Sequence, residues 1–206
     1  MRLLAYLQSL AWCIIPALGN VEKTIFLAPE AIHIPQQHPH LGDLKLEVLT
    51  PWNSTLRRQL PAAFPKPGLD KGKEAWFLLD GLTPRQRYEV RICWAATVSS
   101  HNSHLRLWRL PLFLNAKWRV QQPTEFIFDT YSLAATFDTP ELITSLAVYS
   151  ESRQTSDSPE RDPRLHLLKA GPSAILFLRV IAAADYYTTN ETLMQNVPLV
   201  NVDISD

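Results

Sequence analysis

The stretch 79–92, LDGLTPRQRYEVRI, is the part of the sequence that decides the fold prediction. Leu82, Pro84 and Tyr88 make a Leu-x-Pro-x-x-x-Tyr run that leads into a strand of alternating apolar residues. This run is similar to the tyrosine corner of β-sandwich domains, where the phenol hydroxyl bonds back to the turn and the ring packs in the core. An ordinary buried tyrosine is the alternative interpretation. The turn, the proline spacing and the strand alternation agree with one another, which favours the corner.

Further strands and one helix are predicted on both sides of this motif. Apolar or alternating segments predict strands over 22–28, 44–48, 75–79, 87–95, 124–131, 165–168 and 174–187. The run Asp138-Thr139-Pro140-Glu141 has the capping side chain, first-turn proline and early acid of a helix start. Segments 50–73 and 150–164 are rich in proline or polar residues, and we expect loops there. The predicted fold class is mostly β, a single β-sandwich domain of the immunoglobulin or fibronectin III type with one short helix.

The N-terminus has the features of an export signal. Arg2 gives a positive start, an apolar run follows over 3–18, and the small residues up to Gly19 fit cleavage after that residue. We therefore predict a signal peptide over 1–19 and a luminal domain over 20–206. A buried N-terminal helix and an uncleaved membrane anchor are the alternatives.

Two Asn-x-Ser/Thr sequons support a luminal location for the domain. They begin at Asn53 and Asn190, and we predict glycosylation at both. Cleavage of the signal would remove Cys13 and leave Cys93, so no internal disulfide would form in the mature chain. Cys93 lies in an apolar strand pattern, which favours a buried structural thiol over a nucleophile.

Residues 98–120 differ from the sequence around them. They carry four basic side chains and no acidic one, together with Trp108 and Trp118. A membrane-surface or partner-binding loop, a solvent-facing insertion and an unspliced intron are three interpretations. Joining 97 to 121 would leave two strands linked by a turn of hairpin length, and the codons of Val98 start with the GT of an intron. We therefore treat 98–120 as an atypical insertion whose origin transcript sequencing would decide.

Several segments outside 98–120 resemble a fungal protein family. They are EKTIFLAP at 22–29, WFLLDGLTPRQRYEVRICWAAT at 76–97, QPTEF at 122–126, FDTY at 128–131, FDTPEL at 137–142, SLAVYSES at 145–152 and NETLMQNVPLV at 190–200. Together they resemble the GPI-mannosyltransferase II co-activator family. The resemblance implies a non-catalytic partner of the transferase that adds the second mannose to the GPI precursor in the endoplasmic reticulum. It also implies a C-terminal membrane helix, whereas no apolar run of membrane-spanning length follows residue 20.

The sequence lacks the motifs of common enzyme classes. It has no Gly-x-Ser-x-Gly elbow and no Walker loop, and its aspartates form no recognisable acid pair. The three histidines within 33–40 have no cysteine or carboxylate cluster at the spacing of zinc ligands, apart from Asp43 nearby, which favours a solvated loop. A formal net charge of zero argues against a nucleic-acid-binding protein. We therefore predict no catalytic residue, no metal and no cofactor.

The expected function is binding. The chain would be a non-catalytic accessory subunit that stabilises or orients the catalytic GPI mannosyltransferase II subunit, a membrane protein, from the luminal side of the endoplasmic reticulum membrane. The loop around Trp52 and the turn over 84–87 are candidate contact surfaces. The alternative function is a secreted or cell-surface β-sandwich module for adhesion or carbohydrate binding.

Overall fold

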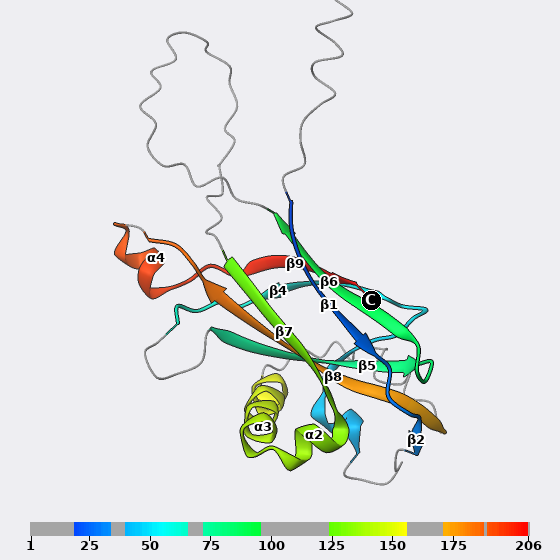
Figure 1. Cartoon of the computed structure of the whole chain (residues 1–206). Helices are drawn as coiled ribbons and strands as arrows, with labels where there is room; N and C mark the ends of the chain where they lie inside the picture. Colours follow the sequence, from blue (N-terminus) through cyan, green and yellow to red (C-terminus); the bar gives the residue numbers. More distant parts are fainter. Residues whose placement is uncertain are drawn as a thin grey trace, which may run out of the picture.

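The domain consists of two β-sheets and a helical layer (Figure 1). The computed structural model describes residues 19–33, 40–65, 72–95, 124–155, 171–187 and 189–205. The strands are β1 (Gly19–Leu27), β2 (Ile32–His33), β3 (Glu47–Leu49), β4 (Thr55–Leu60), β5 (Lys73–Leu82), β6 (Arg87–Ala95), β7 (Thr124–Ser132), β8 (Pro172–Ala184) and β9 (Val200–Ser205). The helices are the 3-10 helix η1 (Leu41–Leu44), α2 (Leu133–Asp138), α3 (Pro140–Thr155) and α4 (Glu191–Gln195).

The first sheet has the strand order β1-β6-β9-β4, and every pairing in it is antiparallel. β1 pairs with β6 over its whole length, from Gly19 opposite Ala95 to Leu27 opposite Arg87. Successive side chains of a strand point to opposite faces. Val90 and the other apolar residues of β6 therefore point into the core, as their alternation predicts.

β8 is the central strand of the second sheet. β5 pairs antiparallel with one edge of β8, and β7 and β2 pair antiparallel along the other edge. β3 adds to the far side of β5 as a short parallel strand. The second sheet therefore ends at β7 on one side and at β3 on the other.

The two sheets pack face to face around the main core, as aligned sheets do in sandwiches. From the first sheet the core takes Phe26, Leu56, Leu60, Val90, Ile92, Val202 and Ile204, and from the second Phe77, Leu79, Phe126, Leu176, Leu178 and Val180. The mostly β, two-sheet fold is confirmed.

α3 covers the outer face of the second sheet (Figure 1). Its Leu146 packs into a second core with Trp76 of β5 and Phe177 of β8. The helix begins at Pro140 as predicted, but it continues to Thr155, so the prediction of a loop from residue 150 is wrong for its first turn and a half. The short helices α2 and α4 were not predicted.

Three strands were not predicted, and one of them was missed for a physical reason. β2 and β9 were not predicted at all, and the prediction of a loop over 50–73 is wrong for Thr55–Leu60, which form β4. Along β4, Arg58 occupies an inward position between two buried leucines and bonds to the buried Glu47. A charged residue at an inward position interrupts the apolar alternation from which a strand is predicted. Of the strand predicted over 44–48, only the last two residues are β.

Some predictions concern residues outside the described part of the chain. These are the signal peptide up to residue 18, the segment 98–120, the strand over 165–168 and His38. Among the helices of the described residues, none is long and apolar enough to span a membrane.

Candidate functional site

Leu82, Pro84 and Tyr88 lie at the connection from β5 to β6. The backbone N–H of Thr83 donates a hydrogen bond of 2.9 Å to Tyr88 Oη. The Tyr88 ring stacks on Phe26 with 5.9 Å between the ring centroids, and Leu82 is buried in the main core. The bond back to the turn and the inward packing of the ring are those expected of a tyrosine corner.

The connection itself is a tight turn with one strained residue. Gln86 N–H donates to the Thr83 carbonyl over 3.1 Å, which closes a four-residue turn with Pro84 in its second position. Arg85, in the third position, has a φ of 61°, which identifies a type II turn. Its guanidinium reaches the exposed Glu30, with 2.6 Å between Nε and Oε1. The predicted contact surface over 84–87 is therefore exposed, but its conformation serves the strand connection.

The first sequon lies in a turn just after β3. Asn53 and Thr50 exchange backbone hydrogen bonds of 2.9 and 3.3 Å, and Asn53 is half-buried. Trp52 is 57% exposed and packs against Gly81, because a Cβ built on Gly81 would lie 2.3 Å from the indole ring. The loop around Trp52 is therefore anchored on β5 and presents the rest of its indole to solvent.

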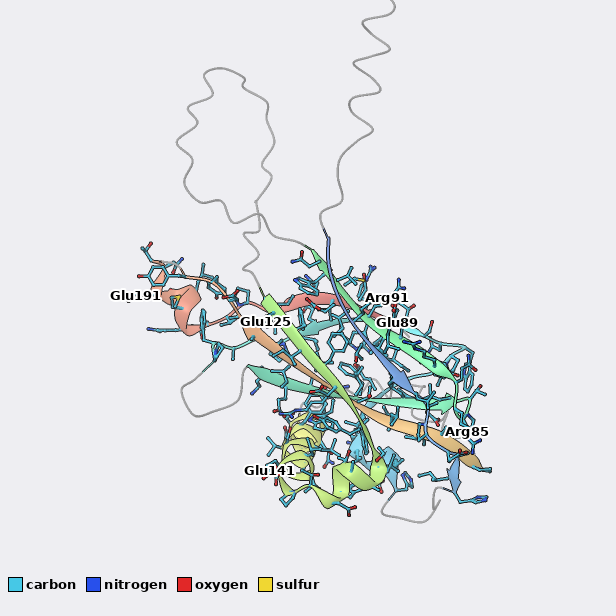
Figure 2. The ribbon with its side chains drawn as sticks, in the orientation of Figure 1. Arg85, Glu89, Arg91, Glu125, Glu141 and Glu191 are labelled. Carbon is cyan, nitrogen blue, oxygen red and sulfur yellow. The ribbon has the colours of Figure 1, made fainter. Side chains whose placement is uncertain are left out.

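The second sequon begins α4. Asn190 is exposed, and its side-chain oxygen accepts a hydrogen bond of 3.0 Å from the backbone N–H of Thr192. Glu191, the next residue, lies at the opposite end of the domain from Arg85 (Figure 2). A glycan on Asn190 would therefore project far from the tyrosine corner.

Glu47 on β3 is a buried carboxylate that joins the three layers. It is 6% exposed, and its Oε1 accepts hydrogen bonds from Arg58 of β4 and, over 3.3 Å, from Arg153 of α3. Burial raises the pKa of the neighbouring Tyr149, which packs against both cores. One carboxylate oxygen thus links the first sheet, the second sheet and the helix.

The other inward-lying carboxylates also serve the fold. Trp76 Nε1 donates to Ser145 Oγ over 2.9 Å, Ser145 donates to Glu74, and Arg179 of β8 donates to the second oxygen of Glu74. Asp80 is 3% exposed and accepts bonds from the backbone N–H that follows it and from a serine of β8. These groups hold strands and helix in place.

The histidines and the cysteine of the described residues are dispersed. Within the described ranges, no group of three His, Cys, Asp or Glu side chains is placed to hold a metal ion. His33 lies in β2, and the backbone N–H of His40 donates to the Asp43 carboxylate over 2.8 Å. Cys93 is only partly buried, on the outer face of β6, so the prediction of a buried thiol is wrong. Strand alternation turns Cys93 away from the core that its neighbours enter.

The outer face of the first sheet has no helix packed on it among the described residues. Its edge strand β1 presents three apolar side chains there, with exposures of 53% for Val21, 47% for Ile25 and 63% for Leu27. The fourth outward residue of β1 is Lys23. We call these four residues the β1 outward row. Sequence reasoning predicted the strand but missed the row, because the alternation alone does not say which face is covered.

Ion pairs cross the rest of this face. Lys23 Nζ lies 3.0 Å from Glu89 Oε2, and Arg91 bonds to the other carboxylate oxygen, which together lower the pKa of Glu89 (Figure 2 labels Glu89 and Arg91). Arg57 makes two bonds to Asp203, of 2.6 and 3.1 Å, and lowers the pKa of that carboxyl. The charged side chains of the face are Lys23, Arg57, Arg87, Arg91, Glu89 and Asp203. Positive charge is therefore in excess.

Comparisons with known protein families, characterised proteins and solved structures found no match for this chain. Its class is defined by the fold, a mostly β two-sheet sandwich with a helix on the second sheet. The feature of that fold that points to a function is the β1 outward row on the open face.

Proposed function

We propose that this chain is a binding protein without catalytic activity, the accessory subunit of the GPI mannosyltransferase that adds the second mannose to the GPI precursor. The observation that carries the binding role is the exposure of Val21, Ile25 and Leu27 on one edge strand, with Lys23 between the first two. Exposed apolar side chains rimmed by charge are typical of interaction surfaces. The choice of partner rests on the family resemblance of segments such as 76–97 and 190–200.

The carboxylates inside the fold support a role without chemistry of its own. Glu47, Glu74 and Asp80 each accept hydrogen bonds from groups of neighbouring strands or of α3. A general acid or base needs a carboxyl group within reach of a substrate, whereas these three are committed to contacts inside the protein. The chain would then act by binding the folded transferase and raising its stability through mass action.

Deletion of the gene and capture of the tagged protein test the proposal together. We expect the deletion strain to accumulate GPI precursors that carry one mannose, and we expect the tagged chain to recover the second mannosyltransferase from detergent-solubilised membranes of the endoplasmic reticulum. Normal GPI assembly in the deletion strain would reject the proposal. Accumulation of the protein in the culture medium without such a partner would instead support the adhesion or carbohydrate-binding module.

The luminal location has its own test in the two sequons. Asn53→Gln and Asn190→Gln variants, each compared before and after endoglycosidase H, report whether either asparagine carries a glycan. We expect a mobility shift that depends on Asn190, because that side chain is exposed and the next residue, Glu191, lies at the end of the domain (Figure 2). An enzyme-insensitive band for the wild-type chain would contradict glycosylation in the lumen.

A further inference from the structure

β1 has backbone groups that are directed away from its own sheet. Ala28 N–H donates to the Gln86 carbonyl over 2.9 Å, and the β1–β6 register places these two residues opposite each other. Hydrogen-bonded and non-bonded pairs alternate along an antiparallel ladder, so the even-numbered residues of β1 bond to β6. The N–H and C=O groups of the β1 outward row therefore point away from β6. Among the described residues no other strand hydrogen-bonds to that side of β1, although β7 lies close to β1.

The edges of this sandwich differ in how well they are protected. Proteins protect edge strands by keeping them short, by flanking them with proline or by placing charge on them. β3 has three residues, β4 lies between Pro51 and Pro61, and β7 carries Glu125 and Asp129 and has no exposed large apolar side chain. β1 also carries two charged residues, Glu22 and Lys23, but it has nine residues, no proline, no register shift against β6 and three exposed apolar side chains. It is the edge best suited to accept another strand.

The charges beside β1 indicate which kind of strand could pair with its edge. Lys23 is the one charged residue of the outward row, and its neighbours on β6 are Arg87, Glu89 and Arg91. A second copy of β1 would add another lysine and no carboxylate to this row, and like charges that face each other across strands are unfavourable. A strand that carries a carboxylate next to Lys23 would balance the excess positive charge.

We infer that the β1 edge binds an extended segment of a protein partner, which adds to the first sheet as a fifth strand. The segment places apolar side chains beside Val21, Ile25 and Leu27 and a carboxylate beside Lys23. Main-chain hydrogen bonds to the free side of β1 supply affinity, and the side-chain row supplies selectivity, as in other cases of β-strand addition. This inference rests on the proposed function, because it identifies the surface through which that partner is held.

Variants of the tagged full-length chain test it in the capture experiment described above. The double variant Val21→Lys/Ile25→Lys puts charge into the outward row, Ile25→Pro removes an outward N–H, and Lys23→Glu reverses the row's charge. Val148→Lys on α3 is the matched control, because Val148 is 63% exposed and lies on the other side of the molecule. We expect roughly tenfold less transferase with the first three variants, as for the loss of an interface hot spot, and wild-type recovery with Val148→Lys.

The outcomes separate the inference from the proposed function. If the wild-type chain recovers no transferase, the proposed function fails. If the wild-type chain recovers it and the double variant, Ile25→Pro and Lys23→Glu all recover it equally well, strand addition at β1 is rejected while the proposed function stands. A dimer in light scattering that Ile25→Pro abolishes, or sedimentation with phosphatidylserine-containing vesicles that the row variants abolish, would overturn the inference in favour of a second copy or a lipid surface. Matching thermal melts of variants and wild type exclude a folding defect.

Discussion

The outer faces of the two sheets are built in opposite ways. On the second sheet, Trp76 and Phe177 lie under Leu146 of α3, and a buried carboxylate ties the helix to both sheets. On the first sheet, the outward residues are apolar side chains and ion pairs in contact with solvent. The outer face of the second sheet therefore contributes to the stability of the domain, whereas the outer face of the first sheet is available for binding.

This difference predicts how substitutions divide between the faces. A residue under α3 loses packing, hydrogen bonds and buried area when it is truncated, whereas a residue on the open face loses contacts that water replaces. We expect the free energy of unfolding to depend strongly on the covered face and weakly on the open face, and partner binding to show the reverse dependence.

The largest effect is expected at Trp76. Its side chain is fully buried, and its indole N–H donates to Ser145. Replacing it with alanine leaves a cavity and removes the donor to Ser145, whose hydroxyl keeps its bond to Glu74, so Trp76→Ala should lower the free energy of unfolding by about 4 kcal/mol. Urea denaturation measures this, with the exposed Val148→Ala as the control, for which we expect a change within about 0.5 kcal/mol. Equal effects of the two substitutions would contradict the conclusion that packing between α3 and the second sheet stabilises the domain.

The next effect is expected at Glu47, where two arginines meet one buried carboxylate. Glu47→Gln leaves Arg58 and Arg153 without their common negative partner. Since both guanidinium groups are partly exposed, water compensates in part, and we expect a loss of about 2 kcal/mol rather than the full cost of a broken buried pair. Thermal unfolding of Glu47→Gln beside Glu30→Gln, an exposed acid that also pairs with an arginine, checks the number. Equal loss in both variants would show that burial of Glu47 adds nothing.

The same cluster explains what the sequence could and could not predict. β6, which has clean apolar alternation, and the helix start at Pro140 were predicted because their signals are local, although β9, which alternates as cleanly, was overlooked. β4 and the last turns of α3 were missed because their inward positions hold Arg58 and Arg153, whose partner Glu47 lies far away in sequence or in another layer. Only the folded chain shows that these polar residues face inward.

The candidate functional features also include one that the sequence predicted and one that it did not. The tyrosine corner was predictable, because proline spacing and tyrosine position are encoded within seven residues. The β1 outward row was not, because its exposure depends on which face of the strand meets the second sheet and on the absence of a covering helix from the described residues of that face. Edge status is a property of the strand order, which local sequence does not specify.

A gain in stability is expected from deletion of 98–120, the connection from the first sheet to the second. Trp94 near the end of β6 and Phe126 near the start of β7 contact each other, with 4.7 Å between ring centroids. Five remaining residues can span roughly 17 Å, more than the roughly 10 Å between packed sheets. A shorter connection has a lower entropic cost of loop closure, so the deletion should stabilise the domain by about 1.5 kcal/mol.

Urea unfolding of the deletion variant and of the full chain measures that gain. Replacing 98–120 with a Gly/Ser segment of equal length is the control, and it should leave the free energy of unfolding near the wild-type value. Loss of cooperative unfolding on deletion would show that the segment contributes to the core.

A smaller loss is expected at the tyrosine corner. Tyr88→Phe keeps the ring stacked on Phe26 but removes the oxygen that accepts the Thr83 N–H. The turn is solvent-exposed, so water can replace the lost partner, and we expect a loss of about 1 kcal/mol. Hydrogen exchange at Thr83 should accelerate in the variant. An unchanged exchange rate would mean that the phenol does not hold the turn in solution.

The smallest effect is expected from the ion pairs of the open face, and it has a defined pH dependence. Lys23 and Arg91 lower the pKa of Glu89, and Arg57 lowers that of Asp203. A carboxyl whose pKa is lowered by folding contributes stability above its unfolded value and loses that contribution as pH falls through the lowered value. The contribution is therefore complete at neutral pH and disappears in acid.

Urea midpoints of Glu89→Gln/Asp203→Asn and of the wild type, measured from pH 7 to pH 2, test this dependence. Both side chains are exposed and screened by solvent, so the two curves should lie close together at neutral pH and converge at the acid end. The variant should lose less stability between these limits, because it has two fewer carboxylates to protonate. Curves that diverge as pH falls would reverse the expected sign, and curves that stay parallel would show that Glu89 and Asp203 do not contribute to the acid sensitivity.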